Sequence, residues 1–146
     1  MRAINVLLAI LVSLIIGAAV LEGGLRLIGL GPAVTLNQYD PVTGWSKKPD
    51  FSLSRTHPDA ANKIQFDLNS MGLRDDEVSE KKPEGVFRIL ALGDSFTLGF
   101  GVNRENLFVD VLEHWWNEEG RRVEVINAGT EAYSTDQAVA WLEGYG

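Results

Sequence analysis

A serine after an apolar run is the residue of this sequence best placed to do chemistry. It closes the triplet Gly93-Asp94-Ser95, which follows the run from Val86 to Leu92 that only Arg88 interrupts. Such a run predicts a buried strand, and open α/β sheets place their reactive groups at the carboxyl ends of strands. A serine there can have an exposed hydroxyl, nearby backbone N–H groups and the positive end of a helix dipole. Ser95 is therefore a candidate nucleophile; the alternative is a β-turn in which Asp94 and Ser95 bond their own backbone.

The elements expected to position Ser95 form a strand–helix–strand–helix pattern. An amphipathic helix is predicted over residues 105–119, a strand over 123–126 and a second helix over 137–142, capped by Ser134 or Thr135. The first helix is expected to bury one apolar face and expose one polar face. The apolar face comprises Leu107, Phe108, Val111, Leu112 and Trp115, and the polar face comprises Asp110, Glu113, Asn117 and Glu118.

The helical crossover makes the two predicted strands parallel. The loops that follow parallel strands lie at the same edge of the sheet, so residues 127–133 should lie beside Ser95. Backbone donors from two loops that point at one position could form an oxyanion hole.

The N-terminus carries an almost unbroken apolar run from Ile4 to Leu21, preceded by Arg2. Its length is sufficient for a helix that crosses a bilayer once, and the positive end is expected to stay in the cytoplasm. The rest of the chain would then be exported, to the periplasm or the cell exterior, and tethered to the inner (cytoplasmic) membrane. A cleaved signal peptide is the competing interpretation, with Gly17-Ala18-Ala19 as a cleavage site. Gly31-Pro32 is expected to end the helix.

Three regions follow from these patterns: an N-terminal anchor over 1–31, a β-rich extension over 32–84, and an α/β core over 85–146. Within the extension, residues 39–45 predict a turn followed by a short strand. Residues 64–69 alternate in polarity and predict a half-exposed strand, and residues 69–72 predict a turn. The charged run over 74–82 is expected to be a solvated loop.

Composition excludes several classes of function. The formal net charge of the 146 residues is -7, which argues against a nucleic-acid partner. The chain has no cysteine, so thiol catalysis, disulfides and cysteine metal sites are excluded. No cluster of ligating side chains predicts a metal site, and the segment 93–101 lacks the lysine that ends a phosphate-binding loop. We expect no cofactor.

Two motif blocks together resemble the SGNH (GDSL-like) hydrolase superfamily, and most closely its membrane-anchored bacterial members. The first block is residues 89–97, Ile-Leu-Ala-Leu-Gly-Asp-Ser-Phe-Thr. The second runs from Val-Ile-Asn-Ala-Gly at 125–129 to Tyr-Ser-Thr-Asp-Gln at 133–137. The anchored members also carry an Asn-Ser-x-Gly-Leu-Arg turn, which here spans residues 69–74. The resemblance extends from about Trp45 to the last residue.

The resemblance implies a flavodoxin-like three-layer α/β/α fold and hydrolysis of an ester through a serine. It makes Ser95 the nucleophile and its N–H one oxyanion donor, supported by Gly93, Asp94 and Asn127. The second donor of the family is usually a glycine; the register assigns that position to Ala132 rather than Gly129. The role then requires Ala132 to have a negative φ, because a glycine-only conformation would cost stability or misplace the donor.

The family's Gly-x-Asn-Asp block and its Asp-x-x-His block are absent from this chain. Its two histidines, His57 and His114, are expected to have surface or packing roles, with Asp110 and His114 paired along one helix. Because an unassisted serine hydroxyl is a poor nucleophile, we expect the chain to be the N-terminal part of a longer enzyme, with little activity by itself.

Three functions remain open at this stage. The first is an exported serine esterase that acts on a small ester. The second is an O-acetyltransferase or deacetylase that acts on acylated envelope polysaccharide. The third is a non-catalytic envelope protein that binds a glycan or a partner, for which Trp116 and Trp141 could stack on sugars.

Overall fold

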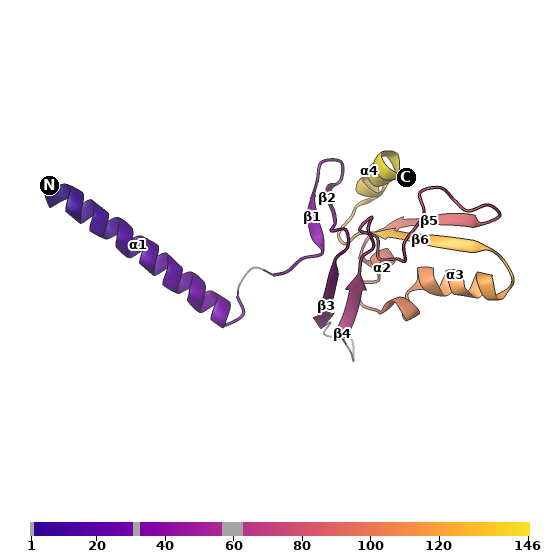
Figure 1. Ribbon diagram of the computed structural model, residues 1–146, viewed down its shortest axis with the longest axis horizontal. Helices are drawn as coiled ribbons and strands as arrows, with labels where there is room; N and C mark the ends of the chain where they lie inside the picture. Colours follow the sequence, from indigo (N-terminus) through magenta and orange to yellow (C-terminus); the bar gives the residue numbers. More distant parts are fainter. Residues whose placement is uncertain (1, 31–32, 57–62) are drawn as a thin grey trace. The chain divides into compact units, whose positions relative to one another are not determined.

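The structure of the protein is a computed structural model that describes residues 2–30, 33–56 and 63–146. The chain divides into two compact units, Met1–Thr35 and Leu36–Gly146, and each is described by itself. His57 lies outside the described residues, as does the predicted helix stop at Gly31-Pro32. Figure 1 shows the order of the elements along the chain.

The first unit is built on one long helix, α1, which spans Arg2–Leu27. Its segment Ile4–Leu27 contains an 18-residue window with a mean hydropathy of 2.8, and the helix is long and apolar enough to cross a membrane. The helix ends before the predicted Gly31-Pro32 stop, because Gly29 takes a φ of 78° and the N–H of Leu30 bonds the carbonyl of Leu25 at 2.8 Å. The predicted apolar helix is therefore present, and it extends beyond the run that the sequence marked.

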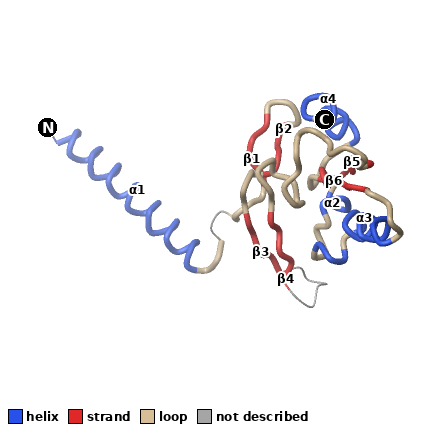
Figure 2. The backbone as a smooth tube through the Cα atoms, turned by 45° about the vertical axis from the view of Figure 1, so that its right-hand side comes forward, coloured by secondary structure: helices blue, strands red, loops and turns tan. Residues whose placement is uncertain are grey.

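The second unit begins with two antiparallel hairpins, visible as separate strand pairs in Figure 2. One pairs β1 (Asn37–Asp40) with β2 (Gly44–Lys47), and the other pairs β3 (Ser52–Thr56) with β4 (Lys63–Asp67). The strands predicted near 39–45 and 64–69 are thus present as β2 and β4. The predicted turn over 69–72 is present as well, closed by the N–H of Gly72 on the carbonyl of Asn69 at 2.9 Å.

A parallel pair of strands forms the third sheet. It joins β5 (Phe87–Gly93) to β6 (Val123–Gly129), with Ile89 opposite Val125 and Gly93 opposite Gly129. Between them the chain forms a four-residue helix, α2 (Ser95–Leu98), a 3₁₀ turn, η1 (Arg104–Asn106), and the helix α3 (Phe108–Glu118). The helix α4 (Thr135–Tyr145) follows β6. The parallel arrangement and the mixed α/β class confirm the sequence prediction at this level.

The two longer helices lie on opposite sides of the β5–β6 pair (Figure 1). On one face, Val109 of α3 packs with Val125, Ile89 and Trp116. On the other face, Trp141 of α4 packs with Ile126, Leu90 and Leu73. Trp116 and Trp141 are therefore half-buried packing residues rather than exposed rings. A third cluster lies under the β3–β4 hairpin, around Phe66 and Leu98.

The structure corrects the predicted faces of the first core helix. The helix begins at Phe108 instead of residue 105, and Phe108, Val111 and Trp115 are exposed. The side that faces the sheet carries Val109 and Trp116 instead. Glu113 and Asn117, which were placed on the solvent face, bond the backbone of β6. Helix α3 has two overlapping apolar stripes. Contact with the β5–β6 sheet determines which of the two is buried.

The charged run over 74–82 is not a uniformly solvated loop. Arg74, its first residue, is 0% exposed. Its guanidinium donates to four backbone carbonyls, those of Leu98 at 2.9 Å, Gly99 at 2.7 Å, Gln65 at 2.7 Å and Val102 at 2.9 Å. Buried carbonyls need hydrogen-bond donors. The guanidinium of Arg74 is therefore stabilised in the interior by the four carbonyls that accept its N–H groups.

Candidate functional site

Ser95 lies where the sequence placed it, at the carboxyl end of β5. It is the first residue of α2 and is half-buried, and Asp94 caps that helix by accepting the N–H of Phe96 at 2.9 Å. Among the described residues, none bonds the hydroxyl or the N–H of Ser95. Both groups are thus free to act on a bound molecule.

The helix after Ser95 differs from the one that the sequence predicted. The short helix α2 ends at Gly99, which has a φ of 76°, and α3 begins only at Phe108. A single turn has a small dipole. The dipole of the longer helix is therefore not available at Ser95, and any anion stabilisation there must come from individual N–H groups.

The loop after β6 is joined to the loop that carries Ser95. The N–H of Thr130 donates to the carbonyl of Gly93 at 2.9 Å. Gly129 allows close contact, because a Cβ at that position would lie 2.3 Å from the backbone nitrogen of Leu98. The expected proximity of the two loops is confirmed, and it depends on a residue without a side chain.

Ala132, the candidate second donor, adopts a left-handed backbone conformation with a φ of 63°. It occupies the third position of a turn closed by the N–H of Tyr133 on the carbonyl of Thr130 at 3.2 Å. A turn with positive φ at this position usually has glycine there. The negative φ that the sequence analysis required is therefore wrong for Ala132. Its side chain is exposed and its N–H has no partner among the described residues.

Gly129, the alternative donor, already uses its N–H. That group donates to the side-chain oxygen of Asn127 at 3.0 Å. Asn127 is 1% exposed, and its backbone N–H donates to a carboxylate oxygen of Asp75 at 2.8 Å. Its side-chain nitrogen is buried without a partner in the described part of the chain. Asn127 thus supports the loop by holding Gly129 in place.

His114 is not placed as a base for Ser95. His114 lies on the outer side of α3, with its side chain 75% exposed, and pairs with Glu118 at 3.2 Å. The predicted pairing of His114 with Asp110 is wrong, because Asp110 contacts Arg104 at 2.6 Å instead. His57 lies outside the described residues.

A buried lysine supports the loop after β6 from the other side. Lys47, at the end of β2, is 5% exposed, and its ammonium donates to the carbonyl of Gly129 and the hydroxyl of Thr130. Burial lowers the pKa of Lys47 to about 8, although the nearby carboxylate of Glu131 opposes this shift. The β1–β2 hairpin therefore holds the loop that contains Ala132.

Further contacts fix the same hairpin to α4 and to the turn before it. The hydroxyl of Tyr133 donates to the carbonyl of Trp45 at 2.6 Å, and that of Tyr145 donates to Asp40 at 2.6 Å. Burial raises the pKa of Asp40, but the hydrogen bonds from Tyr145, Thr43 and Val42 outweigh it and lower that pKa to about 2. This extension is hence part of the support for the candidate site.

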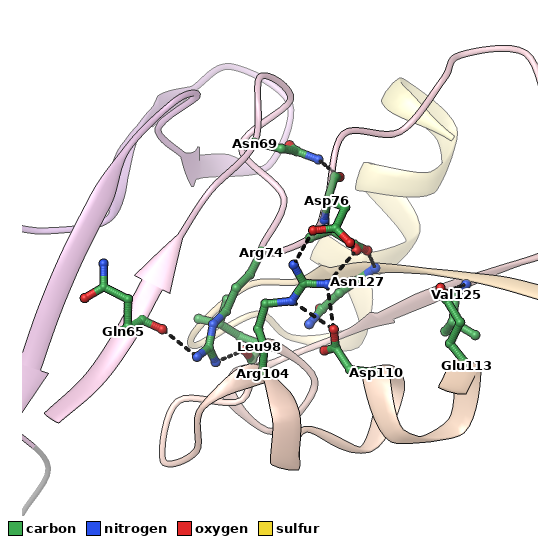
Figure 3. Close-up of polar contacts among 11 residues, drawn as sticks. Gln65, Asn69, Arg74, Asp76, Leu98, Arg104, Asp110, Glu113, Val125 and Asn127 are labelled. Atoms are coloured by element: carbon green, nitrogen blue, oxygen red, sulfur yellow. Dashed lines mark hydrogen bonds and ion pairs between the residues drawn. The ribbon is translucent and has the colours of Figure 1, made fainter. Parts of the chain in front are cut away.

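On the side of β6 away from β5, a second arginine, Arg104, forms ion pairs with several carboxylates. Figure 3 shows Arg104 directed at Asp110 and Asp76, while Arg74 points to Gln65 and Leu98. Arg104 also lies 3.3 Å from Asp75. Burial raises the pKa of Asp75 to about 6, against the lowering effect of the N–H groups of Asn127 and Asp76 and of Arg104.

Sequence reasoning missed Lys47, Arg74 and Asp75 as supports of the site. Each is a charged residue whose role depends on partners far along the chain. The only signal for Arg74 was its place at the end of the resemblance over 69–74, and nothing local marked Lys47 or Asp75.

Comparison with known proteins adds no relative. A scan against protein-family models finds no match, and searches of curated proteins and of solved structures find none either.

Proposed function

We propose that the second unit carries the nucleophile half of a serine-dependent ester hydrolase, with Ser95 as the attacking residue. One observation carries the proposal. The hydroxyl and N–H of Ser95 are both without partners at the carboxyl end of β5, and the N–H of Thr130 fastens a second loop to that point. A free hydroxyl, with free N–H groups on its own loop and on the loop joined to it, supplies two of the parts that acyl transfer needs, the nucleophile and the oxyanion donors.

In this reaction the Ser95 oxygen attacks the acyl carbon of an ester and gives up its proton to a base from solution, which passes the proton to the departing alcohol. The N–H groups of Ser95 and Ala132 are the proposed donors for the oxyanion of the tetrahedral intermediate. The alcohol then leaves with a proton, and water releases the acid from the acylated serine. Ala132 is proposed because its N–H has no partner among the described residues, although its left-handed backbone departs from the negative φ that the sequence analysis required.

No general base for Ser95 is found among the described residues. His114 is exposed and pairs with Glu118, so it has no contact with the serine. The expected rate of the chain alone is consequently low, because proton removal from serine limits attack at neutral pH.

The other two functions have less support. Trp116 and Trp141 are packed against the core clusters, which removes the basis for stacking on a glycan. Transfer of an acyl group to or from a polysaccharide would use the same Ser95 chemistry with a sugar as the acceptor or substrate. We place the reaction outside the cytoplasm, on a chain held by α1 in the membrane. The lengths and apolarity of Ile4–Leu27 support the anchor.

The proposal can be tested by adding imidazole, which acts as the missing general base from solution. The full chain in detergent micelles is mixed with 4-nitrophenyl acetate and increasing imidazole, and release of nitrophenol is followed for wild type, Ser95→Ala and Ser79→Ala. Ser79 is an exposed serine outside the site and serves as the matched control. We expect a rate above the imidazole background that rises with imidazole in wild type and Ser79→Ala.

Ser95→Ala should fall to the background at every imidazole concentration. Mass spectrometry of the quenched wild-type reaction should locate the acetyl group on Ser95. Equal rates for wild type and Ser95→Ala would remove Ser95 from the mechanism, as would an acetyl group confined to lysines.

A further inference from the structure

One peptide group joins the two loops of the candidate site and is held at both of its ends. It is the peptide between Gly129 and Thr130. Its N–H donates to the carbonyl of Gly93, two residues before Ser95, at 2.9 Å, and its carbonyl accepts from the ammonium of Lys47. The hydroxyl of Thr130 accepts from the same ammonium. The orientation of this peptide therefore depends on a carbonyl at one end and on a single side-chain charge at the other.

Lys47 is buried together with the groups that it binds. Lys47 is 5% exposed and Thr130 is 1% exposed, so water has little access to replace the ammonium as a donor to the two oxygens. Charged donors form hydrogen bonds about twice as strong as neutral ones. A donor that polarises a carbonyl also strengthens the bond made by the N–H of the same peptide. The charge of Lys47 thus reinforces the bond from Thr130 to Gly93 as well.

In the described structure, one carboxylate acts on the charge of Lys47, that of Glu131 in the loop after β6. Its Oε2 is buried without a hydrogen-bond partner among the described residues. The turn over 69–72, which lies against the backbone of Lys47, has no titratable side chain. Three further titratable groups of this region are engaged elsewhere: Asp40 with Tyr145, Tyr133 with the carbonyl of Trp45, and Lys48 with the ring of Phe51. Burial lowers the pKa of Lys47 to about 8, against the opposing effect of Glu131, so the amine is charged at neutral pH and uncharged in mildly alkaline solution.

We propose that Lys47 is a positioning residue for the reaction at Ser95. Its charged ammonium holds the peptide between Gly129 and Thr130 in the orientation that keeps the N–H of Ala132 available to the substrate, and loss of that charge releases the loop. The inference rests on the proposed function, because it assigns to Lys47 a role in the same site. Lys47 does not touch the ester; it acts through the peptide that it binds. The site is therefore active with a protonated lysine and inactive in mildly alkaline solution.

Loss of the Lys47 proton affects stability and activity in opposite directions. The pKa of Lys47 in the folded chain, about 8, lies below the ordinary value of 10.5, so between these values the unfolded chain binds the proton more tightly. The contribution of Lys47 to the free energy of unfolding consequently rises with pH through this range. The same loss weakens the hydrogen bonds that orient the loop. A purely structural residue would lower activity and stability together, whereas deprotonation of Lys47 should lower activity while the fold becomes more stable.

The first measurement is amide hydrogen exchange of the full chain in detergent micelles, from neutral to alkaline pH. Protection of the Thr130 N–H, after the intrinsic exchange rate has been divided out, should fall about tenfold as the pH of the wild type rises through about 8, because a neutral amine is a weaker donor than an ammonium. Protection of Ile126, in the middle of β6, should stay constant or rise. Lys47→Met should show low protection of Thr130 at every pH. Lys81→Met, an exposed control, should behave as wild type.

The second measurement is the pH profile of 4-nitrophenyl acetate hydrolysis with imidazole, from which the rate of the same chain with Ser95→Ala is subtracted. This Ser95-dependent rate in the wild type should rise as imidazole loses its proton and fall again above about pH 8. Lys47→Met should be about 10–100-fold slower at neutral pH, because a displaced oxyanion donor loses most of its effect. Its profile should also lack the alkaline fall, which Lys81→Met should keep.

The absence of natural cysteines allows the amine to be restored chemically. Lys47→Cys is treated with 2-bromoethylamine in urea, where the thiolate displaces bromide, and the chain is returned to micelles. The product carries an ammonium on a side chain of nearly the same length, and its pKa is lower because the sulfur withdraws electrons. We expect the Ser95-dependent rate to return at neutral pH and the alkaline fall to move to lower pH. A steric role for Lys47 would leave the position of the fall unchanged and would overturn the inference.

Two further results would overturn the inference: a pH-dependent loss of Thr130 protection that persists in Lys47→Met, and an alkaline fall in rate that persists there. If Lys47→Met does not fold, the wild-type profile of Thr130 protection and its shift in the aminoethylated chain provide the same test. Failure of the proposed function gives a different result. A wild type with the expected exchange but no Ser95-dependent rate would overturn the esterase proposal and the role of Lys47 in it, whereas a Ser95-dependent rate without that exchange would overturn the inference alone.

Discussion

The two edges of the β5–β6 sheet are completed in different ways. Along β6, side chains from α3, from the 74–82 segment and from β6 itself accept the outward N–H groups. Along β5, the outward groups of Arg88, Leu90 and Leu92 have no partner in the described structure. Natural sheets protect the edges that must stay unpaired. The difference indicates that β6 is built as a border of the sheet and β5 as an interior strand.

The largest expected effect is a pH dependence of stability caused by Asp75, which accepts an N–H on the outer edge of β6. Burial raises the pKa of Asp75 in the folded chain to about 6, above the ordinary value of 3.8. Between these two values the folded state holds the proton more tightly than the unfolded state, so the stabilisation is complete below pH 3.8 and is lost as pH rises to about 6. The loss amounts to up to about 3 kcal/mol.

Unfolding of the full chain in micelles, followed by tryptophan fluorescence, would measure this dependence. Asp75→Asn keeps an acceptor for Asn127 but cannot ionise, so the difference in stability between it and wild type should change across this pH range. A constant difference would show that the carboxylate of Asp75 is solvated and that this part of the border is loose.

The next effect concerns Glu113, which accepts the N–H of Val125. Glu113→Ala leaves that buried N–H without a partner and should lower the free energy of unfolding by about 2 kcal/mol. Glu113→Gln retains an oxygen acceptor and should lose less. Glu118→Ala, an exposed change on the same helix, should alter stability by under about 0.5 kcal/mol. If urea titrations gave the same loss in the free energy of unfolding for Glu113→Ala as for Glu118→Ala, the side-chain hydrogen bonds along β6 would contribute nothing to stability.

The smallest expected effect comes from a difference between the loops that follow β5 and β6. The loop after β5 turns at Gly99 with a φ of 76°, whereas the loop after β6 turns at Ala132 with a φ of 63°. Ala132→Gly should raise the free energy of unfolding by about 0.5–1 kcal/mol, because alanine is strained in the left-handed region. Ala138→Gly, inside α4, should lower it by about the same amount. A loss in both variants would contradict the conformation of Ala132.

Local patterns in the sequence predicted the elements well. The apolar run before Ser95 predicted β5, the crossover predicted a parallel partner, and Ser134 with Gln137 forms the capping box that starts α4. These predictions succeeded because each depends on neighbours along the chain.

Several of the predictions that were wrong depend on partners distant in sequence. Helix α3 has two overlapping apolar stripes, and only the strand it packs on selects Val109 and Trp116. Arg74 looked solvated because a charged run normally is, whereas four distant carbonyls draw it inside. For the candidate site, the pattern located Ser95 and the loop beside it. It did not reveal the conformation of Ala132 or the support from Lys47.

The four carbonyls that Arg74 satisfies have a consequence for dividing the molecule into parts. They come from β4, from α2 and from the turn after it, so one guanidinium cross-links the hairpin region to the segment that follows Ser95. A polypeptide started at residue 85 would contain the nucleophile but would leave the carbonyls of Leu98, Gly99 and Val102 without their donor. The smallest piece that can fold around Ser95 must therefore include Arg74 and the β3–β4 hairpin, and an exchange of this core between proteins would have to transfer them with it.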